Sequence, residues 1–362
     1  MSDKAFRVGV IGTSWWADLE HLPGLRARRD VELVSLCGRN PQRLAELAAK
    51  FAVPNTFTDW REMISRGDLE VLVVATPNSL HHPQVMAALD AGLHVICEKP
   101  LAMNVTLARE MVARADGAGR KTMTFFTHRT VAAATHIKRL VEEGFIGQPL
   151  HVSAEYFTAS HLRPGKPLAW KMQRAESGTG VLGDIGSHTI DLVRWWIGDF
   201  SRVCGQWQTV TRDRSGGTAD ADEDCSFLAQ MVCGAQGVFQ ASKLVAGRGN
   251  YQRVELHGSK EALIYEADPG FDATWEGTVY AGRAHPPALE RLALPPDLTA
   301  GLDTPDNQAG RNEAYRRLTD PFFAAIRNGG PVSPDFRDGV AVQAVLDAVA
   351  QSADRNQWVD VR

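Results

Sequence analysis

The sequence predicts an α/β protein with two domains: residues 1–126 form a doubly wound parallel sheet, and residues 127–362 form an α+β domain with an open, mainly antiparallel sheet. Three observations support this fold. The length of 362 residues suits two domains of about 150 residues each. Up to about residue 126, apolar strand-like runs alternate with helix-length segments, which is typical of parallel βαβ units. Beyond residue 127 most strand-like runs follow one another without helices, which favours antiparallel pairing.

The first domain begins with a strand and a helix, and the same alternation continues to its end. The predicted strands are residues 6–11, 31–37, 71–75, 94–97 and 121–127, and the predicted helices reach residue 28 or cover 41–51, 83–91 and 106–115. Asn40 before Pro41 is a helix N-cap followed by proline at the first helical position, and Asn104 can cap a later helix. The run at 71–75 is continuously apolar, as in a parallel strand buried on both faces.

The second domain has a different order of elements. Its predicted helices cover about 130–143, 185–197, 312–328 and 338–353, and its predicted strands cover 151–158, 203–210, 225–232, 237–243, 253–257, 262–266 and 358–361. Residues 268–310 are rich in Pro, Gly and Asp, which indicates a loop with one edge strand.

The composition points to small-molecule chemistry in a reducing compartment. A net charge of -4 gives no basic field that would attract nucleic acid or acidic lipid. The five cysteines show no CxxC spacing, which argues against disulfides and a zinc site. The chain shows no signal-peptide layout, and no apolar run approaches the roughly 20 residues that span a bilayer. We therefore expect a cytoplasmic protein without a membrane or nucleic-acid partner.

The turn after the first strand is the first candidate site. The pattern G-x-G-x-x-G/A uses glycine for a tight turn and for close approach of the backbone to a pyrophosphate, and a small third residue for helix packing. Gly12 and Ala17 fit this pattern, whereas Ser14 stands in the second glycine position. Taken alone, the turn also fits an ordinary strand–helix connection. Its place in a βαβ pattern favours a dinucleotide site of the Rossmann type.

The end of the second strand bears on which dinucleotide binds. An Asp or Glu there commonly holds the ribose hydroxyls of NAD, and an Arg there accommodates the 2′-phosphate of NADP. The chain has Gly38-Arg39-Asn40, without an acid, and Arg43 follows one helical turn later. NADP is therefore favoured over NAD, the alternative being that Arg39 is an ordinary solvated loop residue.

Three later segments carry chemistry-bearing side chains. Thr76, Pro77, Asn78 and His81 follow the strand at 71–75, and Glu98-Lys99-Pro100 follows the strand at 94–97. Both segments lie at carboxyl ends of predicted parallel strands, where open α/β sheets bind ligands. The third segment, G-D-I-G-S-H-T-I-D at 183–191, opens a helix in the second domain.

With these segments the chain resembles the glucose-fructose oxidoreductase / inositol dehydrogenase / rhizopine catabolism (Gfo/Idh/MocA) family of NAD(P)-dependent oxidoreductases. The likeness spans nearly the whole chain and includes E-K-P, D-x-G-x-H and His21-Leu22-Pro23. The resemblance implies that Lys99, Asp184 and His188 line a substrate pocket beside the nicotinamide and are the catalytic residues. It also implies a homodimer or homotetramer formed through the second domain's sheet.

The chemistry of these side chains agrees with the roles that the resemblance implies. Histidine suits the transfer of a hydroxyl proton, and a lysine ammonium stabilises a developing alkoxide. Asp184 would orient the substrate or hold one tautomer of His188. The alternatives are a surface-loop lysine, a core histidine, and a metal site formed by Asp184, His188 and Asp191. Asp191 is expected to pair with Arg194 instead.

Further residues are predicted to bind the cofactor or the substrate beside Lys99, Asp184 and His188. The cofactor set is Gly12, Thr13, Ser14, Trp15, Trp16, Gly38, Arg39, Asn40, Arg43, Thr76, Pro77, Asn78, His81, Glu98, Lys99 and Trp170. The substrate set is Lys99, His128, Arg129, Tyr156, Asp184 and His188. The expected reaction is hydride transfer between NAD(P) and a hydroxyl or carbonyl of a sugar, an inositol-like polyol or a related carbohydrate. Two alternatives are a glycosidase with a redox-neutral NAD(P) cycle and a non-catalytic NAD(P)-sensing regulator.

Overall fold

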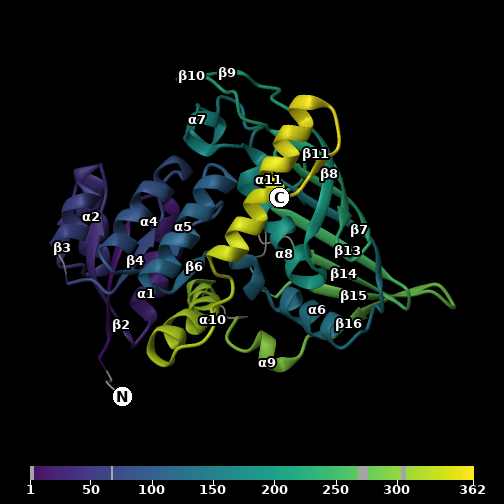
Figure 1. Cartoon of the computed structure of the whole chain (residues 1–362), viewed down its shortest axis with the longest axis horizontal. Coiled ribbons are helices and arrows are strands. Elements are labelled where there is room, and N and C mark those ends of the chain that lie inside the picture. The colour runs from purple at the N-terminus through teal and green to yellow at the C-terminus, as the bar shows by residue number, and fades with distance from the viewer. Residues whose placement is uncertain (1–3, 67, 268–275, 303–306) are drawn as a thin grey trace. The chain divides into compact units, whose positions relative to one another are not determined.

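The computed structural model describes residues 4–66, 68–267, 276–302 and 307–362 (Figure 1). The chain divides into two compact units. Unit 1 comprises Met1–Thr127 and Gln308–Val340, and unit 2 comprises His128–Asn307 and Ala341–Arg362. Each unit has its own sheet. Among the described residues, no helix is long and apolar enough to cross a membrane.

Unit 1 contains a six-stranded parallel sheet with the order β3-β2-β1-β4-β5-β6. Its strands are β1 (Phe6–Ile11), β2 (Val31–Cys37), β3 (Asn55–Phe57), β4 (Val71–Val74), β5 (His94–Cys97) and β6 (Thr122–Thr124). Its helices are α1 (Leu22–Ala27), α2 (Pro41–Phe51), α3 (Trp60–Ser65), α4 (His81–Asp90), α5 (Val105–Ala118) and α10 (Asn307–Asn328). The strand order reverses at β1, between β2 and β4, so the carboxyl end of β1 is the expected ligand site.

The two helix caps predicted in unit 1 are confirmed, whereas the helix predicted from about residue 83 begins at His81. The Asn40 side chain accepts a hydrogen bond from the backbone N–H of Arg43 at 3.1 Å, and α2 begins at Pro41. The Asn104 side chain accepts from the backbone N–H of Leu107 at 3.0 Å, and α5 follows. The strand β4 is buried along its whole length, as the apolar run predicts for a parallel strand between two helical layers.

Unit 2 contains a nine-stranded sheet with the order β16-β15-β14-β13-β7-β12-β11-β8-β17. Its strands are β7 (Pro149–Phe157), β8 (Phe200–Gln208), β11 (Asp224–Met231), β12 (Gln236–Ser242), β13 (Tyr251–Gly258), β14 (Ala262–Ala267), β15 (Thr278–Arg283), β16 (Ala288–Leu292) and β17 (Val359–Asp360). The strands β9 (Asp213–Arg214) and β10 (Gly217–Thr218) form a separate two-stranded ribbon. Neighbouring strands of the large sheet are antiparallel except β7 and β12, which are parallel, so the mainly antiparallel prediction is confirmed.

The helices of this part of the chain are α6 (Ala132–Glu142), α7 (Arg174–Ser177), α8 (Ser187–Ile197), α9 (Pro296–Thr299) and α11 (Phe336–Arg355). Helix α8 contacts β7, β13 and α6. The buried indole of Trp196 on α8 donates to the carbonyl of Ala134 on α6 at 3.0 Å. Trp196 is therefore a core residue that joins the two helices.

The structure differs from the sequence-based fold in two places. Residues 308–340 return to unit 1, although the prediction placed them in the second domain. Tyr315 and Phe322 of α10 are buried in the same core as Phe6 of β1. An apolar helix face shows that a helix packs, but it does not show which sheet it covers. The segment 268–310 was expected to hold one edge strand, but β15 and β16 form a hairpin there; residues 268–275 and 303–306 lie outside the described residues.

Candidate functional site

The glycine turn after β1 lies against the end of β4. Gly12 has φ of +132°, and a Cβ on it would lie 2.2 Å from the carbonyl oxygen of Ala75. Only glycine accepts this conformation and this distance without strain. The lack of a Cβ therefore lets the turn pack directly against the end of β4, at the carboxyl end of β1 where a pyrophosphate is expected to approach main-chain N–H groups.

Replacing Gly12 with alanine is expected to lower the stability of unit 1 by about 1–3 kcal/mol, because the new Cβ meets a backbone oxygen in a disfavoured conformation. Gly117 on α5 is the matched control, since a Cβ there meets nothing within 4 Å. Thermal unfolding of both variants checks the prediction. Equal melting temperatures for G12A and G117A would contradict it.

The other residues of this turn have separate roles. The Ser14 hydroxyl accepts a hydrogen bond from the backbone N–H of Ala17 at 3.4 Å, so it caps the helical segment that follows. The Trp15 side chain is exposed, and its ring lies edge-on to Trp16 at 5.4 Å. The Trp16 indole N–H instead points to the end of β5 and donates to Glu98.

The two arginines after β2 differ in their contacts: Arg39 is exposed, and Arg43 forms ion pairs. A Cβ on Gly38 would lie 2.6 Å from the Thr13 hydroxyl oxygen, so the ends of β1 and β2 meet closely. Arg39 is exposed, and its guanidinium makes no hydrogen bond or ion pair with the described residues. The Arg43 guanidinium, by contrast, binds the Asp18 carboxylate at 2.7 Å, and Lys50 binds the same carboxylate at 2.5 Å. Arg39 is therefore the cation in this group that is open to a ligand.

Hydrogen bonds of His81 connect the segment after β4 to the segment after β5. The buried ring of His81 lies between two carbonyl oxygens, that of Thr76 at 3.0 Å from Nε2 and that of Pro100 at 3.0 Å from Nδ1. The Thr76 hydroxyl donates to Gln84 at 2.8 Å. His81, predicted to contact the cofactor, thus holds these two loops together, and Asn78 beside it is also buried.

The Glu98 carboxylate joins several segments at this edge of the sheet. Its Oε1 accepts from the Trp16 indole at 2.7 Å and lies 2.9 Å from Nε2 of His21. Its Oε2 accepts from the backbone N–H of Lys99 at 3.1 Å. The carboxylate therefore fixes both the glycine turn and the start of the Lys99 loop. Burial opposes its ionisation, yet the hydrogen bond from His21, the nearby Lys99 charge and the Trp16 N–H hold its pKa below the usual value.

In unit 2, three predicted substrate residues come together as a group of rings. The imidazoles of His128 and His188 are stacked, with centroids 4.0 Å apart and planes at 25°. The ring of Tyr156 on β7 lies 5.6 Å from His128 and 6.2 Å from His188. All three side chains are buried. A hydrogen bond between Nδ1 of His128 and Oε1 of Gln252, at 2.8 Å, fixes the orientation of the His128 ring.

Asp184 lies between two lysines. It belongs to a π-helical turn, Leu182–Gly186, that precedes α8, where a regular helix was expected from residue 185. Its Oδ1 accepts from Lys171 at 2.6 Å and its Oδ2 from Lys243 at 2.5 Å. The start of the turn is held by the buried Asp222, whose Oδ2 accepts from the backbone N–H of Leu182 at 2.8 Å and whose Oδ1 accepts from that of Gly180 at 2.5 Å. π-Helical turns often mark functional positions in helices.

Lys243 is the residue of this group that the sequence did not single out. Lys243 directly follows β12, in which alternate side chains are buried. A basic residue at the end of such a strand was the one feature of the sequence that could have pointed to it. Lys171 directly follows Trp170, which the sequence placed in the cofactor set. Its ammonium lies 5.5 Å from the Trp170 ring. The two lysines compensate the charge of Asp184 and fix its orientation.

The predicted pairing of Asp191 with Arg194 is wrong. Asp191 is buried and binds Arg129 through two hydrogen bonds, Nε to Oδ2 at 2.9 Å and Nη2 to Oδ1 at 2.6 Å. Arg194 reaches Asp199 at 2.6 Å instead. A buried carboxylate needs charge-assisted donors, and the guanidinium fork of Arg129 supplies two of them. Arg129, predicted to contact substrate, is thus occupied by this pair.

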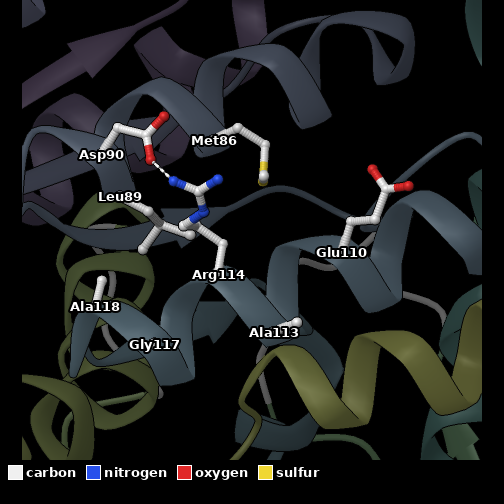
Figure 2. A pocket seen from close by; sticks show the side chains of 8 residues that line it. All are labelled: Met86, Leu89, Asp90, Glu110, Ala113, Arg114, Gly117 and Ala118. Carbon is white, nitrogen blue, oxygen red and sulfur yellow. Dashed lines mark hydrogen bonds and ion pairs between the residues drawn. The ribbon is translucent and has the colours of Figure 1, made fainter.

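A groove elsewhere on unit 1 contains none of the predicted site residues. It lies between α4 and α5 and has a volume of about 670 Å³ (Figure 2). Asp90 and Arg114 form an ion pair across it, beside the apolar side chains of Met86 and Leu89. Among the described residues, no three His, Cys, Asp or Glu side chains are grouped as a metal site, and the five cysteines are free thiols.

The reversal of strand order at β1 and the glycine turn that follows it are typical of a dinucleotide-binding domain, and unit 2 is a second domain with its own, mainly antiparallel sheet. Residues 6–126 match the family model described as "Oxidoreductase family, NAD-binding Rossmann fold", and residues 138–361 match its "C-terminal alpha/beta domain". The chain belongs to this Gfo/Idh/MocA family of NAD-binding oxidoreductases, as the sequence motifs indicated.

Individual relatives agree with this assignment. Levoglucosan dehydrogenase of Pseudarthrobacter phenanthrenivorans is 34% identical over 351 residues, covering 89% of this chain and 87% of that protein. Inositol 2-dehydrogenase of Rhizobium meliloti is 24% identical over 98% of this chain and 99% of that protein. A solved structure of levoglucosan dehydrogenase in complex with NADH has a TM-score of 0.90 and 30% identity, covering 99% of this chain and 100% of that chain.

Proposed function

We propose that the protein transfers a hydride between a nicotinamide dinucleotide and a CH–OH or carbonyl carbon of a sugar, polyol or related carbohydrate. The observation that carries this proposal is the group in unit 2 in which Asp184, held by two lysines, precedes the stacked His188 on the same helical segment. Such a group offers several donors and acceptors to a polyhydroxylated substrate. The names of the similar proteins, levoglucosan, inositol 2- and D-apiose dehydrogenase, support the same substrate class.

The proposal gives each residue a chemical role. The bound nicotinamide would supply the hydride acceptor or donor. Lys99 would donate a hydrogen bond to the reacting oxygen and stabilise its developing negative charge, and His188 would take or return the hydroxyl proton. Asp184, oriented by Lys171 and Lys243, would accept hydrogen bonds from neighbouring substrate hydroxyls. Tyr156 and His128 would provide further polar contacts.

A panel of sugars and polyols, assayed with NAD and NADP in parallel by nicotinamide absorbance, tests the reaction. Net formation of reduced cofactor with at least one member supports a dehydrogenase. Release of sugar without any net change in cofactor would instead support the redox-neutral glycosidase. Tight dinucleotide binding without turnover of any member would support a cofactor-sensing regulator.

We further propose NADP as the preferred cofactor. The end of β2 carries no acid, and the exposed Arg39 is open to a 2′-phosphate, which a carboxylate would repel. Arg43 contributes less to this proposal than the sequence indicated, because Asp18 and Glu46 already engage its guanidinium.

Replacing Arg39 with alanine is expected to weaken NADP binding about tenfold, since one charge-assisted contact to phosphate is lost, and to leave NAD binding unchanged. Calorimetric titration with both dinucleotides measures this. Arg61, an exposed arginine on α3, is the control, and R61A should alter neither affinity. A strong preference of the unmodified protein for NAD would refute the role of Arg39.

Two broader proposals concern assembly and location. The open face of the unit 2 sheet carries exposed apolar side chains that are cross-strand partners, Leu228 on β11 and Val238 on β12. A second copy would cover them, which favours a homodimer or homotetramer. The free thiols of all five cysteines support a cytoplasmic location.

A further inference from the structure

Two buried glutamates lie near each other in unit 1 and differ in charge. Burial raises the pKa of Glu20 to about 8; the Arg311 guanidinium, 3.6 Å from Glu20 Oε2, opposes this rise, and the charge of Glu98 adds to it. Hydrogen bonds keep Glu98 ionised despite its burial. At neutral pH one carboxyl group is therefore mainly protonated and the other is charged, as expected when two carboxyl groups share a low-dielectric region.

The carboxylate of Glu98 is held in place by three N–H groups. Trp16 and the backbone of Lys99 contribute uncharged N–H groups. The second ring nitrogen of His21, Nδ1, is buried and has no hydrogen-bond partner among the described residues, and the ring packs on Phe125 at 4.4 Å. Because a carboxylate oxygen can only accept, Nε2 of His21 is the donor in the contact with Glu98. The carboxylate thus keeps its negative charge inside the fold.

The position of this charge follows from the sheet. The glycine turn and Arg39, at the ends of β1 and β2, belong to the half of the sheet that binds the adenosine nucleotide, and β4 to β6 form the other mononucleotide-binding half. Glu98 and Lys99 follow β5, which lies in that second half. The nicotinamide of a dinucleotide bound across the switch point would therefore approach this carboxylate and the neighbouring ammonium.

We propose that Glu98 is the counter-charge that lets the oxidised, cationic nicotinamide bind beside the Lys99 ammonium. The proposal rests on the proposed function, in which Lys99 remains charged to stabilise an alkoxide. A lysine alone would disfavour the positively charged ring of the oxidised cofactor and not the neutral ring of the reduced one. The fixed carboxylate offsets this repulsion, so it sets the relative affinity of the two redox forms. Glu98 would thus determine which redox form of the cofactor binds more tightly, in addition to contacting the cofactor.

The test compares dissociation constants for oxidised and reduced cofactor, using NADP⁺ and NADPH and also NAD⁺ and NADH, by tryptophan fluorescence and calorimetry. For Glu98→Gln we expect the ratio of oxidised to reduced dissociation constants to rise about tenfold, because one nearby unit charge is removed. Glu20→Gln is the matched control: it also removes a buried carboxyl group of unit 1, but one that is mainly neutral at pH 7. Its ratio should stay unchanged. An unchanged ratio for folded E98Q, or an equal rise for E20Q, would overturn the proposal.

A second variant keeps the proposal testable should E98Q fold poorly. Lys99→Met removes the positive charge, so the same ratio should fall, and a ratio that stays constant or rises would overturn the proposal. These measurements need no turnover and are therefore separate from the test of the reaction. If dinucleotides bind but no substrate turns over, the proposed function fails. The ratio of the dissociation constants of oxidised and reduced cofactor then still tests the role of Glu98 as a counter-charge.

Discussion

Replacing Lys99 with methionine is expected to lower kcat by about a thousandfold while dinucleotide affinity changes far less. The reason is that an ammonium group at the reacting oxygen stabilises charge that develops only in the transition state, and such groups contribute factors of about 10² to 10⁴. Methionine keeps most of the length of the side chain and removes only the charge and the donors. Steady-state kinetics with the best substrate of the carbohydrate panel measures the loss.

Lys121 provides the control for this variant. It also belongs to unit 1, at the start of the segment that leads into β6, and its ammonium donates to the carbonyl of Gly330 at 2.6 Å. K121M should therefore retain the kcat of the unmodified protein. Undiminished activity of K99M would remove Lys99 from the catalytic set, and equal losses in both variants would indicate a general effect of removing lysines.

The elements that carry the dinucleotide site could be predicted because their signals are local. The apolar run of β4, the Asn40 cap and the glycine turn each depend on residues within a few positions of one another. The carboxyl ends of β4 and β5 then meet at one edge by the geometry of a parallel sheet alone. Sequence reasoning was therefore sufficient to place Thr76, Glu98 and Lys99 together.

The partners of the charged groups could not be predicted in the same way. Asp184 is bound by Lys243, 59 positions away, and Asp191 by Arg129, 62 positions away. The three-residue spacing of Asp191 and Arg194 predicts an ion pair on one helix face. Such spacing rules describe only neighbours on the same helix. Which side chain enters a buried position from another element depends on the tertiary packing, and one sequence carries no signal for it.

Replacing Arg129 with leucine is expected to lower the free energy of unfolding by about 3–5 kcal/mol, because it leaves the Asp191 carboxylate buried without its bidentate partner. The side chains of the pair are only 4% and 1% exposed. The double variant R129L/D191L should recover most of this loss, since apolar residues replace both charges. Urea unfolding followed by tryptophan fluorescence measures all three proteins.

The pair between Arg194 and Asp199 serves as a reference, because its acidic side chain is 62% exposed and such pairs contribute about 0–1 kcal/mol. R194L should therefore unfold close to the unmodified protein. A loss for R129L no larger than that of R194L would contradict a structural role of the buried pair. If the double variant is stable but its KM for the carbohydrate rises, Arg129 also contacts the substrate, as the sequence predicted. If the KM stays constant, the guanidinium serves the fold of unit 2 by holding the start of α6 against α8.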